Sequence, residues 1–251
     1  RGYYVAAEGE AAASFTFSDY QYIRGSVESA GFHPVFGSAV LGARVRFGSV
    51  RGMSGTVFGG EDEEVEIIHP TKRFFAGGPV SVRGFGLNLL GPTVLVMSDL
   101  EDCGSGFLTP EELQECANAL PPTAFDERPV GGNVLLEGSL EMRFPLSARF
   151  TVVGFVDAGQ VWRSFDERAS LIATPGVGVR YNSPIGPLRM DLGFNPSAEV
   201  LKPVVAVRSE TGVIVELEDP VPYDPYAWDD PSLFTEFWRR IQLQFSIGEA
   251  F

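Results

Sequence analysis

The sequence contains little that is typical of a helical membrane protein or of an enzyme. No uninterrupted apolar run approaches the roughly 18 residues that a transmembrane helix needs. There are only two histidines, His33 and His69, and each is followed by proline, so we interpret both as turn residues. The sequence has no nucleophile elbow, phosphate-binding loop or metal-ligand spacing. We therefore expect a protein that is not an enzyme and that has no cofactor.

Basic side chains are also scarce. The chain has 19 lysines and arginines against 33 aspartates and glutamates, which gives a formal net charge of −14. A chain of this charge repels the phosphate backbone of nucleic acids, so we expect no nucleic-acid partner. The sequence begins at Arg1, with neither an initiator methionine nor a signal sequence, and we expect a processed or truncated product.

Glycine and aromatic residues are plentiful, and they favour turns and strands. The chain has 29 Gly, 20 Phe and 7 Tyr. Apolar and polar residues alternate with a period of two along much of its length, which is typical of strands that expose two different faces. This alternation predicts about eight strands, near residues 2–13, 19–31, 38–50, 132–144, 149–162, 174–182, 187–196 and 239–251.

The connections between these strands alternate between short and long. Short turns are expected at "GFHPVFG", "FPLSAR" and "NSPIGP", and long connections at about 51–131, 163–173 and 197–238. Such asymmetry is typical of an outer-membrane barrel. A soluble sandwich or lipocalin-like barrel, with its apolar face inward, would give the same alternation. The paired opposite charges and many glycines of the polar face favour the membrane barrel, because they suit a crowded, hydrated lumen.

Four segments, in order along the chain, resemble motifs of the BamA/TamA superfamily of outer-membrane proteins. The stretch "RFFAGGPVSVRGFGLNLLGP", from Arg73 to Pro92, resembles the conserved loop of that family, with Val82-Arg83-Gly84-Phe85 at its core. The stretch "GFVDAGQVW" resembles a strand with an inward aspartate, and "GVGVRYNSPIGPLRMDLGF" resembles the next hairpin. The end of the chain, "LQFSIGEAF", is similar to a terminal strand that finishes in an aromatic residue.

The resemblance implies that the loop folds back into a wide barrel and that Arg83 meets acidic residues on the lumen wall. The residues that match these partners are Glu141 and Asp157, and the alternation independently places Glu141 on the polar face. An arginine can bind a carboxylate with two parallel hydrogen bonds, which are stronger where water is partly excluded. Gly84 would permit a tight or positive-φ backbone, and Phe85 would pack against the wall.

The predicted fold is therefore all-β. We expect a transmembrane antiparallel β-barrel in which residues 1–251 form a single domain, with extracellular inserts at about 51–131 and 197–238. About eight strands are present, so we expect the C-terminal half of a sixteen-stranded barrel. The alternative is eight strands that close on themselves, whose interior would hold only packed side chains.

The resemblance also implies location in the bacterial outer membrane and a function. We expect an assembly factor that inserts and folds client outer-membrane proteins through a lateral seam at its C-terminal strand, in contact with lipid and with periplasmic or lipoprotein accessory subunits. The alternatives are a superfamily transporter that secretes a passenger protein and a passive barrel anchor. The seam strand comprises Ile241, Leu243, Phe245, Ile247, Gly248 and Phe251.

The long inserts carry further signals. Cys103 and Cys116 are the only cysteines, and outside the cell they predict a disulfide worth about 3 kcal/mol. A capping box from Thr109 to Glu112 predicts a helix over about 110–119. The overlapping run "EDCGSGFLTPEE" faintly resembles a calcium loop, but its first and third positions are poor ligands. "VVAVRSETGVIVELE" predicts a hairpin, and Phe237 and Trp238 are candidate membrane-interface anchors.

Overall fold

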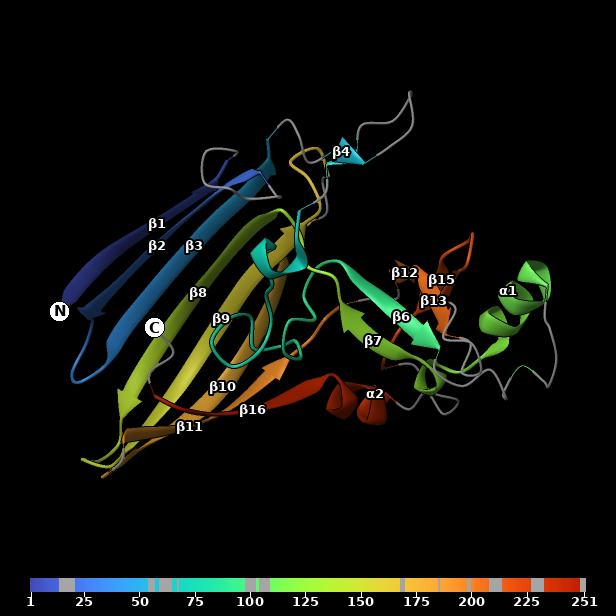
Figure 1. The fold of residues 1–251 in the computed structure, drawn as a ribbon. Coiled ribbons are helices and arrows are strands. Elements are labelled where there is room, and N and C mark those ends of the chain that lie inside the picture. The colour runs from blue at the N-terminus through green and yellow to red at the C-terminus, as the bar shows by residue number, and fades with distance from the viewer. Residues whose placement is uncertain are drawn as a thin grey trace. The chain divides into compact units, whose positions relative to one another are not determined.

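Eight antiparallel strands form one continuous sheet in the computed structural model, which describes residues 1–13, 21–53, 57–58, 65–66, 68–97, 103, 109–167, 170–184, 186–197, 200–207, 214–226 and 233–248. Each strand pairs with its neighbours in chain order (Figure 1). Within the described residues the sheet is open, and its first and last strands are its two edges. This confirms the predicted antiparallel architecture of a partial barrel. The strands are β1 (Gly2–Ala12), β2 (Tyr22–Pro34), β3 (Val40–Gly52), β8 (Val134–Pro145), β9 (Phe150–Trp162), β10 (Ile172–Ser183), β11 (Gly186–Phe194) and β16 (Ile241–Ile247).

The strand boundaries differ from the prediction mainly at the second and last strands. The second strand was expected from residue 19 and begins at Tyr22. The last was expected to reach residue 251, but β16 ends at Ile247 because Gly248 has a φ of 107°, which interrupts an extended strand. Phe251 lies outside the described residues. The three predicted short turns are confirmed between β2 and β3, β8 and β9, and β10 and β11.

The two faces of this sheet differ in polarity in the way expected of a membrane barrel. On the outer face large apolar side chains are exposed, such as Leu140 and Val156, which are cross-strand partners. On the inner face charged side chains are buried, among them Arg44, Glu137 and Asp157. A soluble sandwich would bury the apolar face and hydrate the charged one. The observed arrangement is the reverse, so the soluble alternative is wrong.

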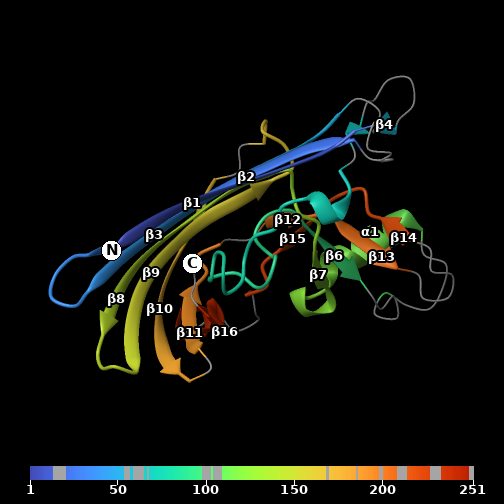
Figure 2. The ribbon, with the colours of Figure 1, turned by 60° about the vertical axis from the view of Figure 1, so that its left-hand side comes forward.

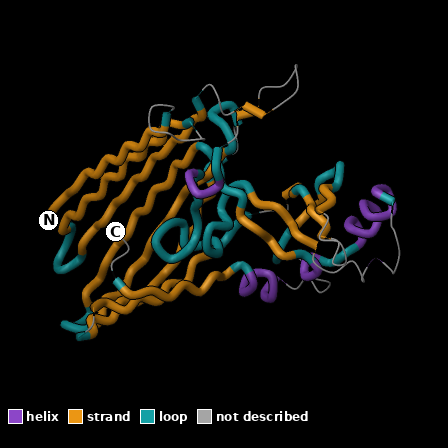
Figure 3. Tube along the Cα trace, viewed as in Figure 1, coloured by secondary structure: helices purple, strands orange, loops and turns teal. Residues whose placement is uncertain are grey.

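A second compact unit is formed by residues 93–130 and 197–240, which come from the two long inserts. It contains a four-stranded sheet in the order β14-β13-β6-β7 and a two-stranded sheet of β12 and β15. Figure 3 draws helices in purple, both those of this unit and the 3-10 turn at residues 70–72. Its elements are β6 (Thr93–Met97), α1 (Pro110–Ala119), the 3-10 turn Pro122–Ala124, β7 (Asp126–Pro129), β12 (Val200–Lys202), β13 (Val204–Val207), β14 (Ile214–Glu216), β15 (Val221–Tyr223) and α2 (Leu233–Arg239).

Several predictions for the inserts are confirmed in this second unit. Helix α1 begins at Pro110 with the full capping box of Thr109 and Glu112. Strands β13 and β14 pair as a hairpin, although the turn at Thr211 and Gly212 lies outside the described residues. Cys103 and Cys116 form a disulfide. The parallel pairing of β6 with β13, which joins one insert to the other, was not predicted because no local pattern marks it.

The second unit has a conventional apolar core. Buried apolar side chains from β6, α1, β13 and β15 pack together, and Leu95, Met97 and Val204 are almost fully inaccessible. Burial in this core raises the pKa of Tyr223 to about 12, assisted by the negative charge of Glu127. The unit is therefore organised like a small water-soluble domain.

The remaining short elements are β4 (Val57–Phe58), which pairs with β5 (Val65–Glu66), and the 3-10 turn Pro70–Lys72. No helix among the described residues is long and apolar enough to cross a membrane. Most of the calcium-like run lies outside the described residues. In the part of the chain that is described, no group of three or more His, Cys, Asp or Glu side chains is arranged to hold a metal ion.

Candidate functional site: a loop bound to the inner wall

The loop from Arg73 to Pro92 lies against the polar inner face of the eight-stranded sheet (Figure 2). It is a compact structure: Phe74 forms a β-bridge to Gly132 ahead of β8, and Ala76 forms a bridge to Leu90. Gly77 and Gly78 both have φ near 100°, a conformation that other residues rarely adopt. These features close the loop on itself and present the residues between, Val82 to Phe85, to the wall.

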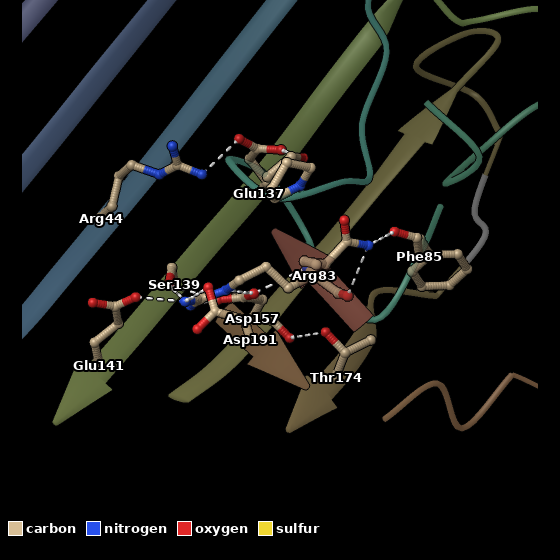
Figure 4. Close-up of polar contacts among 12 residues, drawn as sticks. Arg44, Arg83, Phe85, Glu137, Ser139, Glu141, Asp157, Thr174 and Asp191 are labelled. Carbon is tan, nitrogen blue, oxygen red and sulfur yellow. Dashed lines mark hydrogen bonds and ion pairs between the residues drawn. The ribbon is translucent and has the colours of Figure 1, made fainter. Parts of the chain in front are cut away.

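Arg83 is the centre of the contact between loop and wall (Figure 4). Its Nε donates to Asp157 Oδ2 at 2.7 Å and its Nη2 donates to Asp157 Oδ1 at 2.7 Å, so the carboxylate is bound bidentately. Its Nη1 donates to Glu141 Oε1 at 2.6 Å. The backbone N–H of Arg83 also donates to Asp157 Oδ2, at 3.0 Å. The structure thus brings together the arginine and both carboxylates that the family resemblance selected.

The surroundings of Arg83 make these bonds strong. The side chain is 1% exposed, and its guanidinium lies 3.5 Å from the centroid of the Phe155 ring, a cation–π contact. Ser139 accepts from Nη2 at 3.2 Å and donates to Asp157 at 2.6 Å, which completes the carboxylate's hydrogen bonds. Burial by itself lowers the pKa of Arg83, but the hydrogen bonds and charge of Asp157, with the charge of Glu141, raise it above its ordinary value.

The charged network extends beyond the three residues that the sequence suggested. Asp191 on β11 lies 3.6 Å from Arg83 Nη1 and also pairs with two arginines of the wall, Arg180 on β10 and Arg189 on its own strand. Arg189 donates to the carbonyl oxygen of Pro79 in the loop at 2.9 Å. Period-two alternation is consistent with an inward position for these residues, but nothing in one sequence indicates which of them meet.

A second polar contact holds the loop closer to its start. Ser81 donates to Glu137 Oε2 on β8 and accepts from the backbone N–H of Gly77 at 3.0 Å. Glu137 is buried and is neutralised by two arginines of β3, Arg44 at 3.0 Å and Arg46 at 3.2 Å. These residues were not among the site residues predicted from the sequence. Ser81 therefore fixes the loop to β8, and Arg83 fixes it to β8, β9 and β11.

Gly84 is needed for close approach to the wall. A Cβ atom there would lie 2.5 Å from the Cβ of Thr174 and 3.0 Å from the carbonyl oxygen of Phe194. Its φ is not positive, so the strained-backbone alternative for this glycine is wrong. The wall has a matching gap at Gly193, where a Cβ would lie 2.7 Å from the Arg83 carbonyl oxygen. Two glycines thus let two backbones come into contact.

Val82 and Phe85 supply the apolar part of the contact. Both belong to a buried cluster on the inner side of the sheet, together with Phe74 and Leu90 of the loop. The wall contributes Tyr22, Val50, Leu135 and Val161 to the same cluster. Apolar packing on one side and charged hydrogen bonds on the other define a single orientation for the loop.

The predicted seam strand is β16, an edge strand in the described sheet. Leu243, Phe245 and Ile247 point outward and are 62–65% exposed, while Ile241 is partly buried at the start of the strand. Gly248 follows the strand and donates its N–H to the carbonyl oxygen of Pro187 at 2.8 Å. It therefore ends the strand, whereas the sequence predicted it within the strand.

Comparisons with known proteins agree with this architecture. The Omp85 superfamily domain matches residues 1–251, the full sequence. A solved structure of BamA from Haemophilus ducreyi lacking POTRA domains 1-3 superposes with a TM-score of 0.57 at 20% sequence identity. The match covers 78% of this chain and 35% of the BamA chain in that structure, so it spans about a third of that chain. At this identity the superposition speaks for the fold alone.

Proposed function

This chain belongs to the Omp85 superfamily, and on that premise we propose that it is part of an assembly factor that inserts and folds client outer-membrane proteins. The superfamily comprises outer-membrane β-barrel proteins for protein insertion and transport, and the chain is an outer-membrane barrel protein of this kind. Its members are non-enzymatic barrels, and we propose that this chain likewise catalyses no chemical reaction.

The observation that carries the proposal is the edge of β16. In the described sheet this strand pairs with β11 only, so one row of its backbone N–H and C=O groups is available to another strand. Its outward side chains Leu243, Phe245 and Ile247 are apolar and exposed. A client strand could add to this edge by β-augmentation while its own apolar side chains enter the bilayer.

We further propose that residues 1–251 act as one barrel domain with extracellular inserts and form the C-terminal half of a sixteen-stranded barrel. An open sheet in lipid leaves unpaired backbone groups at both edges, and each such group costs several kcal/mol, so β1 and β16 each need a partner strand, which we propose the rest of the full protein supplies. The two long inserts follow β3 and β11 in the chain, and each leaves its strand at the end opposite the short turn that precedes that strand. In a barrel with short periplasmic turns, this is the extracellular end.

The test uses the full-length protein reconstituted into liposomes, with an unfolded outer-membrane protein added from urea. The proposal expects the client to reach its heat-modifiable, protease-resistant form faster than in liposomes without protein. Periplasmic or lipoprotein accessory subunits can then be added one at a time to identify partners. If the folding rate is unchanged, the assembly role is wrong. If instead a soluble passenger crosses the bilayer, the chain belongs to a secretion transporter.

A further inference from the structure

The last strand of the sheet is bonded to the loop motif through one side chain, Gln244. This residue is on the inward face of β16, between the outward Leu243 and Phe245. Its Nε2 donates to the carbonyl oxygen of Phe85 at 2.9 Å and to that of Arg83 at 3.4 Å. Because both partners are carbonyl oxygens, which only accept, the amide can bind them only through its NH₂ end.

The position of Gln244 lets it bind the side of the motif that the wall carboxylates do not reach. Across the strand pair it is in register with Asp191, which lies 3.6 Å from Arg83 Nη1. Its neighbouring register pair, Gln242 and Gly193, includes the glycine that makes room for the loop backbone. Asp157 thus binds the guanidinium and backbone N–H of Arg83, whereas Gln244 binds the carbonyl oxygens of Arg83 and Phe85.

We propose that Gln244 is a positioning residue that couples the seam strand to the loop, so that β16 cannot move without releasing the Val82–Phe85 turn. The proposal rests on the proposed function, in which β16 is the strand that clients meet. It adds a regulatory contact: the loop, bound to β8 and β9 through Arg83, restrains the edge strand through Gln244.

The restraint acts on a strand at the edge of the described sheet. It pairs with β11 over seven residues, from Ile241 to Ile247, and has no second neighbour in the described sheet. Edge strands with one neighbour open locally more easily than central strands. Two hydrogen bonds to a buried, charge-paired loop therefore shift the balance between closed and open states of this strand.

The coupling must also act in the opposite direction. If the loop favours the closed strand, the closed strand favours the bound loop by the same factor. Loss of Gln244 should therefore loosen residues 82–85 as well as β16, although neither segment has lost its other contacts. A residue that only stabilised its own strand would change β16 alone.

The test is hydrogen–deuterium exchange of the full-length protein in lipid nanodiscs, without client. Gln244→Ala and the nearly isosteric Gln244→Glu both remove the donor, and we expect about tenfold faster exchange in β16 and in residues 82–85. Gln244→Lys keeps N–H donors on a flexible stem beside Asp191 and should stay near the wild-type rate. Ser246→Ala is the matched control, because Ser246 is on the same face and its buried hydroxyl has no hydrogen-bond partner among the described residues.

Two results would overturn the coupling: unchanged exchange of residues 82–85 in both donor-removing variants, or an equal effect of Ser246→Ala. Because the measurement involves no client, it is independent of the assembly role. Faster exchange at both segments in a protein that does not accelerate client folding would support the coupling and contradict the proposed function.

Discussion

The barrel wall and the second unit use opposite arrangements of the same residue types. At the wall, Glu141 and Asp157 are buried together with Arg83 of the loop, and large apolar side chains face outward. In the second unit, Leu95, Met97 and Val204 are buried and glutamates such as Glu111 are exposed. The wall faces lipid on its outer side, whereas the second unit has the apolar core of a water-soluble domain. The surrounding solvent, and not the residue type, decides which side chains are buried.

The second unit is strongly acidic, whereas the rest of the chain is nearly neutral. Residues 93–130 and 197–240 contain 17 acidic and five basic side chains, a net charge of −12. The remainder of the chain contains 16 acidic and 14 basic side chains, a net charge of −2. Charges enclosed in a barrel must be nearly balanced, because an unpaired buried charge is costly. Charges at a hydrated surface need no partner. Nearly all of the net charge of the sequence therefore comes from the second unit.

The largest expected effect in this comparison comes from breaking the buried ion pairs of the wall. Arg83→Ala leaves Asp157 without its bidentate partner and should lower the free energy of unfolding by about 3–5 kcal/mol. Asp157→Asn should have a smaller effect, because Glu141 still binds Arg83. Thermal unfolding in detergent and limited proteolysis of residues 73–92 measure both. In the second unit, the control Glu111→Ala should change stability by less than about 0.5 kcal/mol. Unchanged proteolysis in both wall variants would contradict the role given to this ion pair.

The next effect concerns the disulfide, which belongs to the second unit alone. Replacing Cys103 and Cys116 by serine removes the cross-link over 13 residues of sequence and should destabilise this unit by about 3 kcal/mol. Proteolysis with and without a reducing agent should show faster cleavage within residues 93–130, while the heat-modifiable mobility of the barrel stays the same. An equal loss of barrel stability would mean that the two units unfold as one.

A smaller effect is expected on the lipid-facing side. Leu140→Arg on the outer face of β8 should cost about 2 kcal/mol, since a basic residue costs about 2–4 kcal/mol at the bilayer midplane and less towards the interfaces. Glu115→Arg, at an exposed position of α1, is the matched substitution in the second unit and should be nearly neutral. Unfolding titrations in lipid vesicles would measure both variants. Equal stability of the two would indicate that the outer face of β8 meets water.

Much of the wall could be predicted from the sequence because its signals are local. Alternation with a period of two gave the strands and their faces, including the polar side of Glu141. The loop motif and its acidic partners came from a family resemblance, and the helix over 110–119 came from a capping box. The boundary errors at β2 and β16 lie where alternation is weak or where a single glycine ends the strand.

Most of the missed features depend on contacts between distant segments, and helix α2 is the exception. Asp191 and Gln244 meet the loop, but nothing in their neighbouring residues indicates this contact. Helix α2 is only seven residues long and lies in a segment rich in acids, prolines and aromatics. The parallel pairing of β6 and β13 joins segments more than 100 residues apart, and no periodicity within either strand encodes it.

By itself, the sequence determined the antiparallel strands, the polarity of their two faces and the short turns between them, because each depends on residues a few positions apart. Only the tertiary structure decided which inward charges pair, how Gly84 and Gly193 bring loop and wall into contact, and that the two inserts fold into one unit. The physical reason is that a side chain's face is set by its own strand, whereas its partner is set by where other strands are placed in space.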